Sequence, residues 1–203
     1  MDLLARTLTA ALLAVILIAL AATSADASHS RGKCKKRGTT VAKNDSARIY
    51  ERGQSLYACA WSRNEEILLD TESDDDYTEV TYGDVILRGR FVAWVQSNRD
   101  YSCKADCPAG YDAITEYVNV VDVIRNVGEK TAAAPAADSL RLNIRGAAAW
   151  LETADSGNSG VLAWEFGRDH ARLLDTGPIS RFRLRGRTLS WLNGETPKSA
   201  TLR

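Results

Sequence analysis

The chain has 203 residues, of which 45% are apolar and 26% are charged, and its 26 basic residues balance its 26 acidic ones. This apolar content is enough for a folded core, so the composition excludes a disordered tail and a collagen-like repeat. The zero net charge gives no general reason to expect binding to nucleic acid or electrostatic adhesion to a membrane.

The N-terminal segment has the features of a secretory signal peptide. An uncharged apolar run, 8–22, follows Arg6, and residues 25–27 then form the small-x-small pattern of signal peptidase sites. The run is shorter than the roughly 20 apolar residues that a membrane-spanning helix needs. We therefore expect a signal peptide at 1–27. The remaining chain is then expected to be secreted, either to the extracellular space or to the periplasm of the cell envelope.

All four cysteines lie after this segment, and an even number of cysteines in an exported chain indicates disulfide bonds. Cys103 and Cys107 lie close together in a polar stretch that ends in Pro and Gly, so the economical prediction is that they pair across a loop. Cys34 is then left to pair with Cys59. Zinc is disfavoured because only two histidines could complete a ligand set. We expect no metal and no cofactor.

Residues 28–37 are predicted to form a basic N-terminal tail. Beyond them, short runs rich in Val, Ile, Leu, Tyr and Trp alternate with turn-forming clusters, and no run has convincing helical periodicity. The pattern predicts a single all-β domain over 38–203. Among the predicted strand runs are 85–96 and 181–191.

A short pattern recurs along this domain. Residues 88–94, Arg-Gly-Arg-Phe-Val-Ala-Trp, match 185–191 in spacing, 145–150 match with one residue missing, and 37–43 are a weaker echo. We interpret each copy as a strand that opens a new unit. With loop insertions set aside, the unit has about 40 residues, which is the period of propeller blades.

Two smaller features accompany the repeat. All five tryptophans follow a small residue, as in Ala93-Trp94, and a later strand of the unit ends in Leu-Asp, as at 69–70 and 174–175. Consecutive strand residues point to opposite faces of a sheet. We therefore expect each large ring to pack in the core on one face, while the small residue lets a neighbour approach on the other. A binding cage of aromatic rings is the alternative.

The Gly-x-x-apolar-Ala-Trp strands, followed by a hairpin such as 117–122 with 128–131, resemble degenerate blades of TolB-like or YVTN-type β-propeller proteins. The resemblance covers roughly 38–203 and implies about four short units of three or four strands, set radially around a central channel. The last unit, 181–203, offers only two strands, so we expect residues 39–43 to complete its sheet and close the ring. A two-sheet β-sandwich is the alternative fold.

Four arginines alternate with other residues, so an extended strand would place all of them on one face; we call them the arginine row. They are Arg181, Arg183, Arg185 and Arg187. Like charges on neighbouring positions repel unless they face water or anions. The row is therefore a candidate polyanion site, for instance for an anionic cell-surface polymer, and a solvated strand face is the alternative.

Carboxylates also alternate in one segment, at Asp70, Glu72, Asp74 and Asp76. Calcium takes six to eight oxygen ligands, so the four side chains are a candidate calcium site. A count of an EF-hand loop from Asp70, however, places Asp75 where glycine is required. A solvated loop between two units is the favoured interpretation.

Catalytic patterns are absent from the sequence. The Gly-x-Ser-x-Gly motif and phosphate-binding glycine loops do not occur, and His170 is the single histidine beyond the basic tail. We therefore expect a non-catalytic extracellular binding or interaction module, with an anionic polymer or an extracellular protein as partner and no nucleic acid. The alternatives are a carboxylate-based hydrolase in a propeller channel and a structural protein of the cell envelope.

Overall fold

The structure, a computed structural model, describes residues 34, 38–101, 113–133, 137–153 and 158–203. These residues form strands β1 to β16, joined by turns, which confirms the all-β prediction. No helix in the described ranges is long and apolar enough to cross a membrane. The predicted signal peptide at 1–27, nearly all of the tail at 28–37, and the pair Cys103 and Cys107 lie outside the described residues.

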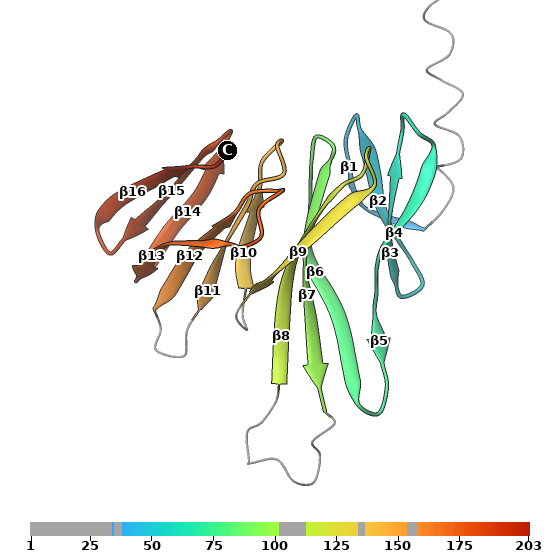
Figure 1. Ribbon diagram of the computed structural model, residues 1–203, viewed down its shortest axis with the longest axis horizontal. Coiled ribbons are helices and arrows are strands. Elements are labelled where there is room, and N and C mark those ends of the chain that lie inside the picture. The colour runs from blue at the N-terminus through green and yellow to red at the C-terminus, as the bar shows by residue number, and fades with distance from the viewer. Residues whose placement is uncertain (1–33, 35–37, 102–112, 134–136, 154–157) are drawn as a thin grey trace, which may run out of the picture.

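The strands form four small antiparallel sheets, named A to D, that follow one another along the chain (Figure 1). Sheet A contains β1 (Thr39–Lys43), β2 (Ala47–Arg52), β3 (Ser55–Ala60) and β4 (Glu65–Thr71). Sheet B contains β5 (Ser73–Asp74), β6 (Thr78–Arg88), β7 (Phe91–Asp100), β8 (Ala113–Asp122) and β9 (Val127–Ala133). Sheet C contains β10 (Ala137–Leu142), β11 (Ala148–Thr153), β12 (Ser159–Trp164) and β13 (Arg172–Gly177). Sheet D contains β14 (Ile179–Arg185), β15 (Thr188–Asn193) and β16 (Thr196–Thr201).

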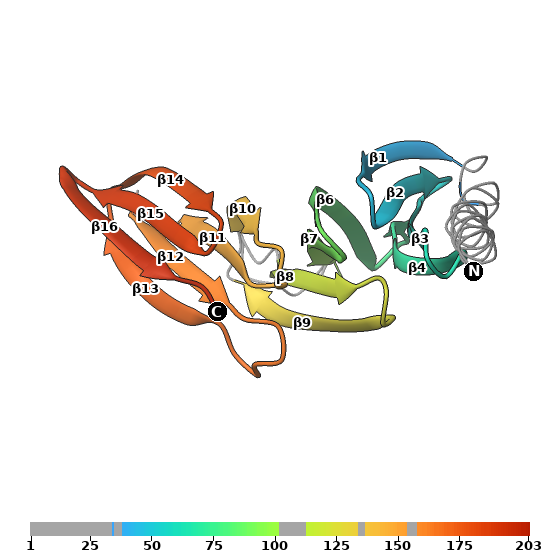
Figure 2. The same ribbon diagram turned by 90° about the horizontal axis from the view of Figure 1, so that it is seen from above.

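The sheets pack face to face in chain order, with an apolar core between each neighbouring pair (Figure 2). The cores include Ile49, Leu56 and Trp94 between sheets A and B; Val118, Leu140 and Trp150 between B and C; and Val161, Leu189 and Trp191 between C and D. A two-sheet sandwich would have a single core between two sheets, and the structure instead has a stack of four.

One strand from each sheet, β1, β6, β10 or β14, lies along the same side of the stack. Strand β6 contacts both β1 and β10, and β10 also contacts β14. Figure 2 shows these four strands on one side of the row of sheets. The four meanders are therefore stacked in the same orientation, so equivalent turns of different sheets lie at the same end.

The tryptophans and the small residues that precede them in the sequence pack on opposite faces of the sheets, as predicted. Ala93 faces the core between sheets B and C, while Trp94, the next residue, faces the core between A and B. Ala149 and Trp150 divide in the same way between the two faces of sheet C. The rings of both tryptophans are buried. These residues therefore belong to the core between sheets, and the small partner lets the next sheet approach closely.

Two hydrogen bonds between sheets use the Leu-Asp strand ends. Asp70, in β4, accepts a bond of 2.6 Å from Trp94 Nε1 and one of 3.0 Å from Gln96 Nε2, both of sheet B. Asp175, in β13, accepts a bond of 2.7 Å from Trp191 Nε1 of sheet D. A buried indole N–H needs an acceptor. In both places the acceptor is an aspartate carboxylate near the end of a strand in the neighbouring sheet.

The disulfide between Cys34 and Cys59 forms as predicted. It lies with Tyr50 on the face of sheet A that points away from sheet B. The carbonyl oxygen of Cys34 accepts a hydrogen bond of 2.6 Å from Arg48 of β2. The disulfide and this bond together fix Cys34 on the outer face of the first sheet.

Residues 39–43 do not complete the last sheet. They form β1, which pairs with β2 inside sheet A, while sheet D has three strands. The reason is local, because only residues 44–46 join β1 to β2. Asn44 Oδ1 accepts hydrogen bonds from the backbone N–H groups of Ser46 (2.8 Å) and Ala47 (3.0 Å), which fold the chain directly back. The predicted closure of a ring by this strand is therefore wrong.

Three of the four recurring Arg-Gly segments lie in turns within a sheet and do not open a unit. Gly89, Gly146 and Gly186 lie between two strands of sheets B, C and D, with φ angles of +56°, +88° and +59°. Glycine adopts these left-handed conformations without the steric penalty that a Cβ brings. Gly38, the fourth predicted start, precedes β1 and lies in no such turn. The strands after Gly89, Gly146 and Gly186 therefore do not open their sheets, whereas the strand after Gly38, β1, is the first of sheet A.

Candidate anion-binding rim

Half of the turns lie together at one end of the molecule. Because neighbouring strands are antiparallel, alternate turns of a meander lie at the same end of its sheet. At this end sheets A, B and C each contribute two turns: β1–β2 and β3–β4, β6–β7 and β8–β9, β10–β11 and β12–β13. Sheet D contributes the β14–β15 turn and the end of β16. Figure 1 shows all of them at the upper end of the sheets.

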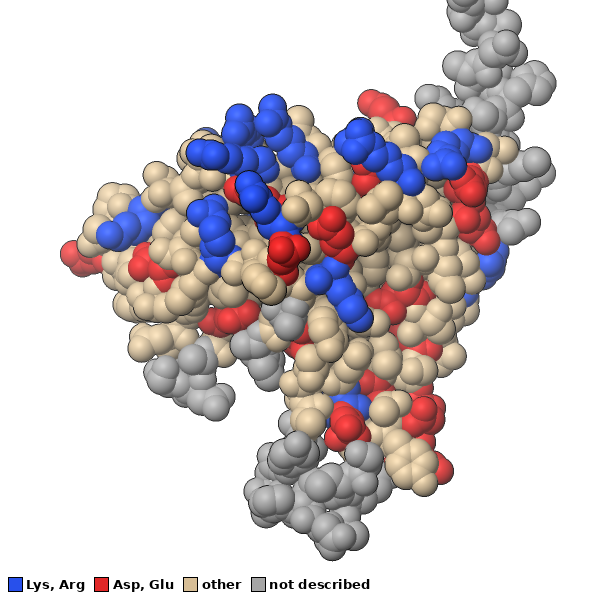
Figure 3. All heavy atoms as spheres, viewed as in Figure 1, with Lys and Arg blue, Asp and Glu red and all other residues tan. Residues whose placement is uncertain are grey.

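These turns and the adjoining strand ends carry a row of basic side chains, which we call the basic rim. Its members are Lys43, Arg63, Arg88, Arg90, Arg125, Arg145, Arg168, Arg185, Arg187 and Arg203. Figure 3 shows lysine and arginine side chains gathered along the upper edge of the molecule. The β5–β6 hairpin, with Asp74 to Asp76, lies at the opposite end. Cations therefore outnumber carboxylates along the basic rim, although rim carboxylates such as Asp122 and Glu165 lie among them.

The turns of neighbouring sheets are in direct contact. Asn44 Nδ2 donates a hydrogen bond of 2.8 Å to the carbonyl oxygen of Gly89, which joins the turns of sheets A and B. A Cβ atom added to Gly89 would lie 3.8 Å from the Cβ of Ile144, in the β10–β11 turn of sheet C. The backbone N–H of Gly167 donates a bond of 2.6 Å to Glu129 of sheet B. These contacts hold the turns in a fixed row.

A buried carboxylate lies beside two of the rim arginines. Asp122 is only 1% exposed and lies 3.0 Å from Arg90 Nε and 3.7 Å from Arg125 Nε. Its other oxygen accepts bonds from the backbone N–H groups of Ile124 and Arg125 in the β8–β9 turn. A buried carboxylate needs such partners because burial without them is costly. Asp122 therefore pairs with both guanidinium groups and offsets part of their charge.

Other rim arginines carry no such partner. Arg88, Arg145 and Arg185 are exposed. Within the ranges that the structure describes, none of the three forms an ion pair. Their charges therefore face solvent and can interact with an anion outside the protein.

The arginine row is only partly regular. Arg183 and Arg185 are both exposed on β14 and alternate with Phe182, which is buried against sheet C. Arg181 has a φ angle of +52° beside a register shift, so the alternation does not extend to it. Arg187 lies in the β14–β15 turn, where its Nε donates a bond of 3.1 Å to a carbonyl oxygen near the chain end. The row thus divides into a strand face and rim positions.

The four carboxylates of the calcium hypothesis have separate environments. Asp70 is buried, and its oxygens accept the bonds from Trp94 and Gln96 described above. Glu72 is half-buried, and Asp74 and Asp76 are exposed. Among the described residues, no three His, Cys, Asp or Glu side chains come together as a metal site. The calcium site stays a prediction.

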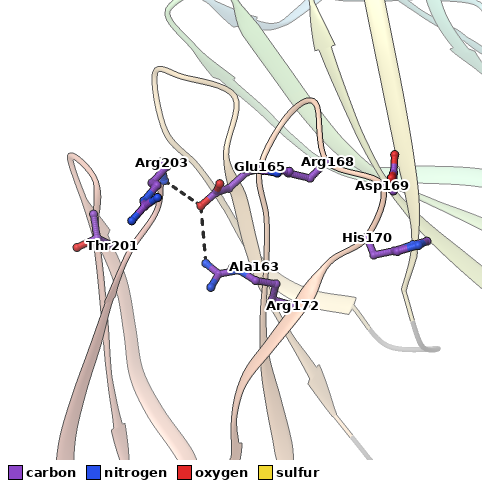
Figure 4. A pocket seen from close by; sticks show the side chains of 8 residues that line it. All are labelled: Ala163, Glu165, Arg168, Asp169, His170, Arg172, Thr201 and Arg203. Atoms are coloured by element: carbon purple, nitrogen blue, oxygen red, sulfur yellow. Dashed lines mark hydrogen bonds and ion pairs between the residues drawn. The ribbon is translucent and has the colours of Figure 1, made fainter.

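A surface cavity of about 590 Å³ lies at the rim between sheets C and D (Figure 4). Its lining residues are Ala163, Glu165, Arg168, Asp169, His170, Arg172, Thr201 and Arg203. Glu165 lies centrally: it is 3.7 Å from Arg172 and accepts a bond of 3.1 Å from the backbone N–H of Arg203. The lining thus combines Arg168, Arg172 and Arg203 with the two carboxylates Glu165 and Asp169, so cations are in slight excess in this cavity.

Two carboxyl groups have pKa values that differ from the ordinary value. Backbone N–H groups of Tyr77 and Thr78 donate to Asp75 and lower its pKa. The hydrogen bond from Trp191 lowers the pKa of Asp175. Both carboxyl groups therefore favour the ionised form more strongly than a free carboxyl does.

The sequence carries part of the signal for the rim. The Arg-Gly-Arg pattern at 88–90 and 185–187 predicts a strand, whereas the structure places its glycine in a hairpin turn, where glycine supplies a positive φ. Arg63 and Arg125 come together with the others only through the stacking of the sheets, which no local pattern predicts. Comparison of the chain with models of known protein families and with curated proteins finds no match.

Proposed function

We propose that this chain is a non-catalytic binding module that holds an extended anionic partner on its basic rim. The observation that carries the proposal is the placement of Arg88, Arg145 and Arg185. Each lies at a glycine-containing turn of a different sheet, is exposed, and has no carboxylate partner among the described residues. Their unpaired charges on fixed turns favour an anionic ligand.

The size of the rim favours a polymer or a charged surface over a small ligand. Packed sheets lie about 10 Å apart. The rim therefore extends over roughly 30 Å from sheet A to sheet D. Because each sheet contributes cations to the rim, a partner with several negative charges can contact several sheets at once. Such multivalent contact raises the overall affinity without any strong single site.

We further infer that the module works outside the cell and that its sheets are degenerate propeller blades. The signal peptide expected at 1–27 and the disulfide between Cys34 and Cys59 support the location, since disulfides persist in oxidising compartments. Four successive meanders, aligned by β1, β6, β10 and β14, support the resemblance to propeller blades. In this proposal the blades form an open stack.

Retention on a heparin column at low salt tests the function. We expect the chain to bind and to elute as salt screens the rim charges. The triple variant Arg88→Gln, Arg145→Gln, Arg185→Gln should elute at clearly lower salt. The matched control, Arg181→Gln, Arg183→Gln, Lys198→Gln, removes three cations around a smaller cavity of sheet D and should elute close to the unmodified chain.

The possible outcomes distinguish binding at the basic rim from binding elsewhere on the protein. Absence of retention at low salt would overturn the proposal. A larger shift for the control variant than for the rim variant would move the binding site to the strand face of sheet D. Equal shifts for both variants would show that the column responds to net charge alone, which also contradicts a dedicated rim.

A further inference from the structure

The most exposed large apolar side chain of the described residues lies on the basic rim. Ile144 is 71% exposed and occupies the tip of the β10–β11 turn. Val127, which is 46% exposed, follows the β8–β9 turn at the same end. An isolated apolar side chain on a protein surface is common. Here, however, one lies at a turn tip and the other directly after a turn, and each is close in sequence to an arginine of the basic rim.

The turn that carries Ile144 is held rigidly. Asn143 Oδ1 accepts hydrogen bonds from the backbone N–H groups of Arg145 (2.8 Å) and Ala147 (3.1 Å). A Cβ atom on Gly146 would lie 2.8 Å from the ring of Phe91, so this part of the turn packs tightly against sheet B. The isoleucine side chain nevertheless points away from the core. It is therefore presented to solvent on a preorganised support, which lowers the entropy lost on binding.

Three arginines lie next to this apolar tip or to the residue it contacts. Ile144 lies against Gly89, whose neighbours in the sequence are Arg88 and Arg90, and Arg145 follows it directly. An anionic polymer in water would contact the arginines but would offer nothing to an exposed isoleucine. An anionic lipid bilayer offers both, because its headgroups attract the cations and its hydrocarbon accepts the apolar side chain.

Resting on the function proposed above, we infer that the extended partner is an anionic lipid surface. The basic rim faces the headgroups, and Ile144 enters the boundary between headgroups and acyl chains, with Val127 beside the surface. The strand axes then run roughly along the membrane normal, since the turns lie at the ends of the strands (Figure 1). The acidic β5–β6 hairpin points away from the membrane, which avoids repulsion by the lipid charges.

Co-sedimentation with vesicles tests the inference. We expect the full chain to bind vesicles of phosphatidylglycerol and phosphatidylcholine more strongly than vesicles of phosphatidylcholine alone. Ile144→Ser should weaken binding to the anionic vesicles about tenfold, because it removes one buried apolar side chain. Leu68→Ser is the matched control: Leu68 is 58% exposed in the middle of β4, away from the turns, and its loss should leave binding unchanged. The apolar run at 8–22 is present in all variants, so its contribution to vesicle binding is the same in each and does not alter the difference between them.

The heparin column completes the test. Ile144→Ser should elute at the same salt concentration as the unmodified chain, because heparin has no apolar interior. Equal loss of vesicle binding in Ile144→Ser and Leu68→Ser would overturn the inference, as would vesicle binding that Ile144→Ser leaves intact. Retention on heparin without any preference for anionic vesicles would overturn the lipid inference alone and keep the anionic partner. Failure on both heparin and vesicles would overturn both proposals.

Discussion

The indole nitrogen of Trp94 lies 2.6 Å from a carboxylate oxygen of Asp70, and this hydrogen bond joins sheet B to sheet A. The same pair of residue types joins sheet D to sheet C, where Trp191 donates to Asp175 over 2.7 Å. A hydrogen bond to a charged acceptor is stronger than a neutral one. The two pairs therefore fix the lateral position of one sheet against the next, which apolar packing alone leaves adjustable.

Replacement of Trp94 by Phe should destabilise the protein through Asp70. The buried carboxylate would lose its shortest hydrogen bond, and we expect a loss of about 1–3 kcal/mol in the free energy of unfolding. Urea denaturation of Trp94→Phe, Asp70→Asn and the double variant measures the coupling. A coupling energy below about 0.3 kcal/mol would show that the pair contributes nothing beyond its separate members.

Asp175 should make stability depend on acid pH. Its folded pKa lies below the unfolded value of 3.8 because Trp191 donates a hydrogen bond to the carboxylate. The unfolded state therefore binds the proton first, and this contribution to stability is present above the unfolded pKa and lost as pH falls through the folded pKa. Urea midpoints measured from about pH 6 down to about pH 2.5 should fall less steeply for Asp175→Asn. Parallel curves for the two proteins would contradict the assignment.

Tyr82 should make stability depend on alkaline pH. Burial, with the nearby charges of Glu51, Glu72 and Asp70, raises the pKa of Tyr82 to about 12 from the ordinary value of 10.0. The unfolded state therefore loses its proton first, so stability is lost as pH rises from about 10 to about 12. Tyr82→Phe should lose less stability over this range. Tyr77→Phe, which removes an exposed tyrosine at the β5–β6 hairpin, is the control and should behave like the unmodified chain.

The turn glycines should differ in their tolerance of alanine. Gly146 has φ +88°, and an added Cβ would lie 2.8 Å from the Phe91 ring, so Gly146→Ala combines backbone strain with overpacking. We expect it to cost about 2–4 kcal/mol. Gly186 has φ +59° with no atom within 4 Å of an added Cβ, so Gly186→Ala should cost only about 1 kcal/mol. Thermal unfolding of both variants measures the difference, and equal costs would contradict the role of Phe91.

The sequence predicted those features that depend on local chemistry. Strand content, the disulfide between Cys34 and Cys59, and the division of Ala93 and Trp94 between two faces follow from residue type and from the two-residue period of strands. The Leu-Asp strand ends at Asp70 and Asp175 are also recognisable in the sequence as a repeat. Their role as hydrogen-bond acceptors cannot be predicted from the sequence, because each accepts from a tryptophan of the next sheet and the two meet only when the sheets are stacked.

The wrong predictions share one physical cause. Ring closure by residues 39–43 assumed a long-range pairing, but the Asx turn at Asn44 directs the chain into the adjacent strand first. The basic rim was also missed as a unit. Charges such as Arg63 and Arg185 are far apart in the chain, and only the common orientation of four meanders brings them to one end. Sequence patterns specify each sheet well and specify the arrangement between sheets poorly.

The stack of meanders also bears on how the chain folds. Each strand pairs with a neighbour in sequence, so nearly all sheet pairing forms between segments a short distance apart along the chain. Such local pairing favours folding faster than that of β proteins whose strands pair across long separations. Sheets A and B can complete their shared core before sheet D exists. Synthesis from the N-terminus therefore lays down the stack one layer at a time, each on a surface already formed.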